Sequence, residues 1–315
     1  LSKYKKNITV FGHTTFKKKL LANYKNIKFS KFFFKSSTKT YLKKFLQYES
    51  LKKSDLIEIH NRPEYINAVF KINKNIVFYF HNNPLEMKSS YKLNDRLDII
   101  KKTKKIIFNS NWTLNQFKKG ISKKEYKDKL EIIHQSTDKK KINFNKKENI
   151  VIFVGRLNKS KGYDIFGKAI IKILNKYPNW KTIIIGDEPR EKILFKHKNF
   201  KLLGFQNYSS VTKWFTKSSI AVVCPKKEEP FGRTALEASS CGCAVIISDK
   251  GGLPEASPKA IKINSLTVKN LEFEITKLIK NDNLLLKLQK KIFNDFKLTN
   301  KKISKKIDLY RNKII

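Results

Sequence analysis

The chain has 315 residues, 40% of them hydrophobic, and a formal net charge of +43. This length accommodates two domains with cores of their own, and the hydrophobic content excludes a disordered chain. The longest apolar runs, such as IVIFVG at 150–155, have the length of a strand, so the sequence predicts neither a membrane-spanning helix nor a signal peptide.

The positive charge does not by itself indicate a nucleic-acid partner. Only six of the 69 basic residues are Arg, and the Lys residues are spread over every segment, whereas a nucleic-acid binder gathers Arg and aromatic side chains on one element. Scattered Lys is compatible with peripheral contact with an anionic membrane, which we expect at the inner face of the membrane. Three cysteines without a CxxC pair or disulfide framework predict a cytoplasmic protein.

In chain order, short apolar runs in the first half predict strands at 8–12, 56–60, 76–81, 106–110 and 130–134. The segments between them, including 41–53 and 91–103, carry apolar residues at helical spacing. This alternation predicts a parallel sheet covered by helices on both faces. We expect these elements to form a first domain over residues 1–145.

After a polar stretch at 139–149, which predicts a linker, the alternation starts again. A helix is expected over 162–176, and strands are expected at 150–155, 182–186, 200–204, 220–225 and 243–248. The fold class is therefore α/β with two Rossmann-like, doubly wound domains. The second domain covers 146–290, and a C-terminal helix at 291–315 is expected to pack back towards the first domain. Ligands should bind at the carboxyl ends of the strands, in a cleft.

The loop after the strand at 150–155 contains Arg156 and Lys161, just before a helix that opens at Gly162. Two cations beside a helix N-terminus predict a site for phosphate oxygens. The same residues are equally compatible with a solvated loop, because Lys is abundant throughout the chain.

The stretch EEPFGRTALEA at 228–238 places Glu229 on a loop and Glu237 in the helix that follows, which is expected to begin between Phe231 and Arg233. A carboxylate accepts two hydrogen bonds side by side and therefore suits a pair of sugar hydroxyls. The alternative is that both are ordinary surface acids. Gly251 and Gly252, further along, are more typical of a tight turn than of a ligand site.

In the first half, His60 and His81 each end a strand and are each followed by Asn, the second being Asn82. Two of the five His residues at adjacent strand ends predict a functional site, with His81 the stronger candidate. His134 is expected to be structural.

These motifs carry a family resemblance. GRLNKSKG at 155–162 and EEPFGRTALEASSCGCAVIISDKGGLPEA at 228–256 resemble the retaining nucleotide-sugar glycosyltransferases of family 4, which have the GT-B fold. FYFHNNPLEM and IIFNSNWTLNQF resemble the branch that acts on lipopolysaccharide and other surface glycans. The resemblance implies a hexosyltransferase-type enzyme that moves a sugar from a nucleotide-diphosphate donor to a glycan or lipid-linked acceptor, without a metal or another cofactor.

Roles for individual residues also follow from the resemblance alone. Arg156 and Lys161 would hold the donor diphosphate, and Glu237 would bind the ribose. Glu229 would contact the transferred sugar and His81 would lie near the reacting centre. The rest of the donor site would be formed by Phe231, Gly232, Arg233 and Thr234, and the acceptor side by His60 and Asn82.

Two features depart from the family pattern. The chain opens on LSKYKKNITVFG and its only Met is Met87, so we expect the first strand and its Gly-rich loop to be missing. Arg233 stands where many relatives carry an apolar residue. The alternatives to a glycosyltransferase are a basic nucleic-acid- or membrane-binding module without catalysis and a GT-B-fold sugar-nucleotide epimerase.

Overall fold

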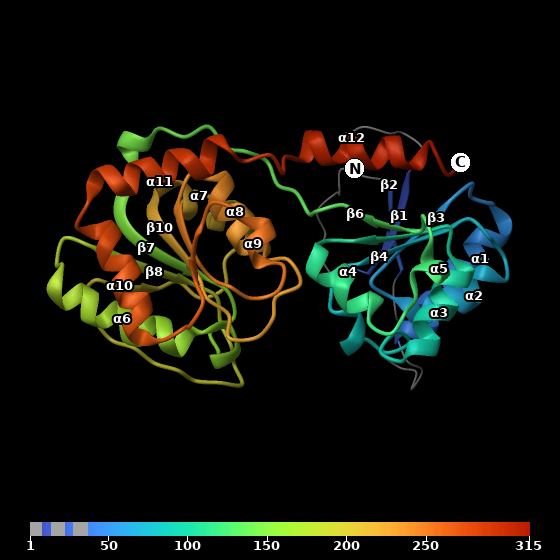
Figure 1. Ribbon diagram of the computed structural model, residues 1–315, viewed down its shortest axis with the longest axis horizontal. Coiled ribbons are helices and arrows are strands. Elements are labelled where there is room, and N and C mark those ends of the chain that lie inside the picture. Colours follow the sequence, from blue (N-terminus) through green and yellow to red (C-terminus); the bar gives the residue numbers. More distant parts are fainter. Residues whose placement is uncertain (1–7, 14–22, 28–36) are drawn as a thin grey trace. The chain divides into compact units, whose positions relative to one another are not determined.

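The computed structural model describes residues 8–13, 23–27 and 37–315, and the chain divides into two compact units (Figure 1). The first unit comprises residues 1–108, 116–131 and 304–315, and the second comprises 109–115 and 132–303. The first seven residues of the opening stretch LSKYKKNITVFG lie outside the described residues.

The first unit contains a four-stranded sheet in the order β3-β4-β5-β6. Its strands are β3 (Ile57–His60), β4 (Ile76–Phe80), β5 (Lys105–Phe108) and β6 (Leu130–Ile132). The pairs β3-β4 and β4-β5 are parallel, as predicted. Every residue of β4 is buried, which explains its continuous apolar sequence. Two further strands, β1 (Thr9–Gly12) and the unpredicted β2 (Asn23–Asn26), form a separate parallel pair.

The helices that begin in the first part of the chain are mostly short. They are α1 (Ser37–Leu51), α2 (Ile66–Phe70), α3 (Leu93–Lys102), α4 (Asn111–Lys118) and α5 (Lys123–Tyr126). The Pro residues after β3 and β4 open two 3-10 turns, η1 (Pro63–Tyr65) and η2 (Pro84–Glu86), because Pro suits the first position of a helical turn. The last helix of the chain, α12 (Asn300–Arg311), contributes residues 304–311 to the first unit.

The second unit contains a six-stranded parallel sheet in the order β12-β11-β10-β7-β8-β9. Its strands are β7 (Glu148–Val154), β8 (Lys181–Ile185), β9 (Phe200–Leu202), β10 (Ser218–Val223), β11 (Ala244–Ser248) and β12 (Ile261–Ile263). The chain builds outward from β7 to β8 and β9, then returns to build from β10 in the opposite direction. The order therefore reverses between β7 and β10, and in sheets of this kind ligands bind outside the carboxyl ends of the strands at such a reversal.

Helices cover both faces of this sheet (Figure 1). They are α6 (Tyr163–Lys176), α7 (Tyr208–Lys217), α8 (Arg233–Ser240), α9 (Leu253–Ala256), α10 (Val268–Ile279) and α11 (Asp282–Asn294), with the 3-10 turns η3 (Phe144–Lys146) and η4 (Lys159–Lys161). Alternate residues of β7 pack on opposite faces: Val151 and Phe153 lie in the cluster with α6 and α10, and Ile150 and Ile152 lie in the cluster with α7 and α8. Each face of the sheet thus has its own core.

The three cysteines are reduced and buried. Cys241 and Cys243 lie between the end of α8 and the start of β11. Across the described ranges, 8–13, 23–27 and 37–315, none of the helices has the length and apolar character needed to cross a bilayer.

Candidate functional site

The loops after β7 and β10 are joined to each other at the reversal of the strand order. The Lys226 amide donates to the Ser160 carbonyl over 2.9 Å. Gly162 has a φ of +74°, and a Cβ at this position would lie 2.0 Å from the Cys224 carbonyl oxygen. Because only glycine avoids both the strained backbone and this clash, Gly162 allows the start of α6 to pack directly on the end of β10.

Lys161 and Glu229, predicted separately from two motifs, form an ion pair. The Lys161 ammonium lies 2.5 Å from Glu229 Oε2, and their side chains are 28% and 24% exposed. The Asn158 side chain accepts a hydrogen bond from the Lys161 amide at 3.0 Å and so fixes the turn that carries this lysine. Arg156, at the start of the same loop, is exposed. The site therefore combines one cation paired with a carboxylate and a second that projects into solvent.

The glycine pair packs against the backbone of Glu229. The Gly252 amide donates to the Glu229 carbonyl over 2.7 Å. Gly251 has a φ of +58°, and a Cβ there would lie 2.3 Å from that same carbonyl oxygen. The two glycines form a turn, as expected. Glycine is needed at these positions because the Glu229 loop occupies the space that a side chain would fill.

Helix α8 begins next to this loop, and no side chain caps its first turn in the described part of the chain. Gly232 at its N-cap has a φ of +100°. Phe231 is only 2% exposed and packs in the core, so its backbone alone is available for a ligand. Thr234 lies in the first turn and is half-buried. The unpaired amides of such a turn attract anions.

Glu237 is the fifth residue of α8 and pairs with Arg233 one turn earlier. The Arg233 Nη2 lies 2.8 Å from Glu237 Oε1, and the Glu237 side chain is 15% exposed. Burial raises the pKa of the Glu237 carboxyl, while the charge and hydrogen bond of Arg233 oppose this rise. Arg233 therefore has a defined contact that the sequence did not predict, and it favours an ionised Glu237.

In the first unit, His60 and His81 contact each other at the ends of β3 and β4. Their Nδ1 and Nε2 atoms lie 3.0 Å apart, and their rings are nearly parallel, with an interplanar angle of 7°. One of the two nitrogens must carry the hydrogen, so the pair binds one proton between the rings. The structure thus brings together the two histidines that the sequence singled out.

Asn61 organises this pair, and the sequence analysis missed it. Its backbone has a φ of +58°, which Asn tolerates better than most residues. Its Oδ1 accepts hydrogen bonds from the amides of His81 and Asn82 at 3.1 and 3.2 Å. The His-Asn dipeptide at the end of β3 was the available signal, because a strand end that needs a left-handed residue commonly uses Asn.

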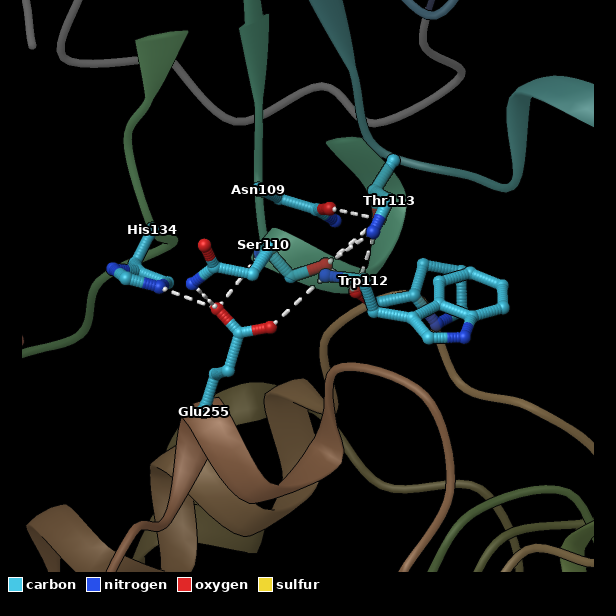
Figure 2. Close-up of polar contacts among 8 residues, drawn as sticks. Asn109, Ser110, Trp112, Thr113, His134 and Glu255 are labelled. Atoms are coloured by element: carbon cyan, nitrogen blue, oxygen red, sulfur yellow. Dashed lines mark hydrogen bonds and ion pairs between the residues drawn. The ribbon is translucent and has the colours of Figure 1, made fainter. Parts of the chain in front are cut away.

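Glu255 is a second residue to which the sequence analysis gave no role, although it lies in the quoted stretch at 228–256. Figure 2 shows its carboxylate reaching from α9 to His134 and to the start of α4. It accepts hydrogen bonds from the Asn111 amide (2.8 Å), the Trp112 amide (3.2 Å) and the His134 ring (3.0 Å). The last of these contacts ties His134 to α9.

No candidate metal centre accompanies these residues: within the described ranges, no three His, Cys, Asp or Glu side chains are grouped so that they could hold an ion.

Residues 134–295 match the family described as "Glycosyl transferases group 1". The chain belongs to this family. The match covers β7 through α11 and so includes both carboxylate motifs and the loop of Lys161. The predicted resemblance to retaining family 4 glycosyltransferases is confirmed.

Curated relatives of this chain match over part of their length. An uncharacterized glycosyltransferase of Methanocaldococcus jannaschii is 37% identical over 129 residues, which are 36% of this chain and 32% of that protein. The lipopolysaccharide core biosynthesis mannosyltransferase LpcC of Rhizobium leguminosarum is 28% identical over 32% of this chain and 31% of its own length. The matched regions thus span about a third of each of these relatives.

Solved structures share the fold at low identity. Sucrose-phosphate synthase of Thermosynechococcus elongatus has a TM-score of 0.73 and 15% identity, covering 96% of this chain and 88% of that one. HepE of Anabaena, crystallised with UDP, has a TM-score of 0.71 and 17% identity, covering 87% and 82%. The predicted GT-B fold is confirmed.

Proposed function

We propose that this chain transfers a sugar, with retention at the anomeric carbon, from a nucleotide-diphosphate donor to a glycan or lipid-linked acceptor. One arrangement supports this more than any other. At the reversal of the strand order in the second unit, Glu229 lies before the uncapped first turn of α8 and Glu237 lies one turn into that helix, and each carboxylate contacts a cation.

The diphosphate would bind at the first turn of α8. The amides of Gly232, Arg233 and Thr234 supply unpaired donors there, and Arg156 and Lys161 supply positive charge. An ammonium group has three hydrogens, so Lys161 can keep its contact with Glu229 and still donate to a phosphate oxygen. Cations held in place in this way stabilise the charge that develops on a leaving diphosphate.

The two carboxylates would bind the two ends of the donor. Glu237, with Oε1 on Arg233, keeps its other oxygen for the ribose hydroxyls, and Glu229 contacts the hydroxyls of the transferred sugar. His81 would act near the reacting carbon, with His60 and Asn82 on the acceptor side. In this assignment the leaving phosphate takes the proton of the acceptor hydroxyl as that oxygen attacks on the same face.

The names of relatives guide the choice of acceptor. Besides the mannosyltransferase above, the chain matches the gpi3 component of the phosphatidylinositol N-acetylglucosaminyltransferase of Schizosaccharomyces pombe, at 30% identity over 34% of this chain and 25% of that protein. We therefore propose a lipid-linked or surface-glycan acceptor and a role in cell-surface polysaccharide synthesis. We also propose that the protein is cytoplasmic and binds peripherally, through its Lys residues, to the anionic inner face of the membrane.

A calorimetric titration with UDP, GDP, ADP and their sugar conjugates tests the donor site. We expect one nucleotide to bind, and Glu237→Gln to weaken that binding by about tenfold or more, because a buried partner of the ribose is lost. Glu272→Gln serves as the control, since Glu272 pairs with Lys172 on the surface of α10. Equal nucleotide affinity in the wild type and Glu237→Gln would contradict the assignment.

A further inference from the structure

The carbonyl group of Pro230, next to Glu229, is held by the segment at the start of α4. Ser110 Oγ lies 2.6 Å from this carbonyl oxygen and Thr113 Oγ1 lies 3.2 Å from it. Both hydroxyl residues are fully buried. Figure 2 shows them together with Asn109 on the segment that enters α4.

The distances show which of the two hydroxyls holds the Pro230 carbonyl. Each hydroxyl has one hydrogen to donate. Thr113 Oγ1 lies 2.8 Å from Asn109 Oδ1 and 2.8 Å from Ser110 Oγ, and both are closer to it than the Pro230 oxygen. Ser110 Oγ is closest to the Pro230 oxygen and accepts a hydrogen bond from the Thr113 amide at 3.0 Å. Ser110 is therefore the donor that holds Pro230.

Glu255 fixes Ser110 in turn. Its carboxylate binds the backbone amides of Asn111 and Trp112, the two residues that follow Ser110, and the Asn111 side chain at 2.8 Å (Figure 2). These are amides of the first turn of α4, which a carboxylate stabilises. Ser110 is thus placed by a contact that comes from α9, next to the glycine pair.

The loop of Glu229 is consequently held at successive carbonyls by two different elements. The Gly252 amide binds the Glu229 carbonyl, and Ser110 binds the Pro230 carbonyl. Glu237 depends on neither contact, because it lies within α8 and is held by that helix and by Arg233.

We propose that Ser110 is a positioning residue that sets the place of the Glu229 carboxylate through the Pro230 carbonyl, with Glu255 holding Ser110. The inference rests on the proposed function, which gives the transferred sugar to Glu229 and the ribose to Glu237. Loss of the Ser110 hydroxyl then weakens binding of the sugar part of the donor and spares the nucleotide part.

The test compares the dissociation constants of a free nucleoside diphosphate and of its sugar conjugate by calorimetry, for the nucleotide that the wild type binds. In Ser110→Ala we expect the ratio of conjugate to free dissociation constants to rise about tenfold, with the free nucleotide bound as in the wild type. Glu255→Gln retains every hydroxyl and should shift the ratio in the same direction by a smaller factor. Thr113→Val is the matched control, and its ratio should stay within about twofold of the wild-type value, because the Thr113 hydroxyl is closer to Asn109 and Ser110 than to the Pro230 oxygen.

The outcomes separate the two proposals. A wild type that binds no nucleotide overturns the donor site and the role of Ser110 together. A wild type that binds, with an unchanged ratio in Ser110→Ala and Glu255→Gln, overturns the role of Ser110 alone. A parallel rise of both dissociation constants would mean that Ser110 only supports the fold, and this also contradicts the proposal.

Discussion

Arg311 and Glu58 form a two-point ion pair in the first unit although 253 positions separate them in the sequence. Nε and Nη2 of the guanidinium lie 2.8 and 2.5 Å from the two carboxylate oxygens, and the side chains are 7% and 16% exposed. Glu58 Oε1 also accepts from the Tyr79 hydroxyl at 3.0 Å, and the Tyr79 ring stacks on His60 with centroids 4.3 Å apart. The last helix is thereby tied to the strands that carry the histidine pair.

Arg311→Met should lower the free energy of unfolding of the first unit by about 3 kcal/mol, because it leaves the Glu58 carboxylate buried without its cation. Hydrogen exchange of the β3 and β4 amides would measure this as a lower free energy of opening. Lys306→Met on the same helix is the control. Lys306 pairs with Glu131 over 3.0 Å in a half-exposed position, where such pairs contribute at most about 1 kcal/mol. Equal losses in the two variants would contradict the importance of burial.

Gly251→Ala and Gly204→Ala separate backbone strain from crowding. Both glycines have left-handed backbones, with φ of +58° and +65°, but a Cβ at Gly204 would meet nothing within 4 Å. We expect Gly204→Ala to cost about 1 kcal/mol, and Gly251→Ala to cost about 3 kcal/mol because its Cβ must displace the Glu229 carbonyl. Urea denaturation followed by fluorescence of Trp180 and Trp214 would report on the second unit. A Gly251→Ala loss no larger than that of Gly204→Ala would argue against the close packing.

Arg233→Leu should make nucleotide binding sensitive to acid. Burial raises the pKa of Glu237 and Arg233 opposes this, so removal of the cation raises that pKa further. Protonated Glu237 cannot accept as a carboxylate from two hydroxyls. Affinity in the variant should therefore fall by roughly tenfold per pH unit below the raised pKa, in calorimetric titrations from about pH 8 to about pH 5. Lys172→Leu, on the surface of α6, should follow the wild type. Parallel pH profiles for wild type and Arg233→Leu would refute the role given to Arg233.

The ionised carboxylate of Glu255 should stabilise the second unit at neutral pH, and this stabilisation should be lost in acid. Burial raises the pKa of its carboxyl, but the hydrogen bonds from His134, Asn111 and Trp112 outweigh this and lower it below the ordinary value. A depressed folded pKa contributes stability above the unfolded pKa of about 4.3, and this contribution is lost as pH falls through the folded pKa. The difference in unfolding free energy between wild type and Glu255→Gln should therefore be largest near neutrality and shrink below about pH 4. A difference that stays constant from about pH 7 to about pH 3 would show that the charge is unimportant.

Local pattern was sufficient to predict most of the framework. The apolar runs that became β4, β7 and β10 are buried on both faces, and such strands differ sharply in composition from the segments around them. β2 and β12 were missed because they are short, and Asn-Tyr-Lys-Asn and Ile-Lys-Ile carry too few apolar residues to form a run.

The family, the two α/β units and the separate motifs that contain Lys161 and the Glu229–Glu237 pair could be predicted from the sequence, because each motif lies within one short segment of the chain. Which groups meet was settled by tertiary packing instead. Ser110 binds Pro230 across 120 positions, and Glu255 reaches Asn111 across 144. A hydrogen bond between distant residues leaves no periodicity in either segment, since it depends on the order in which the strands assemble into the sheet.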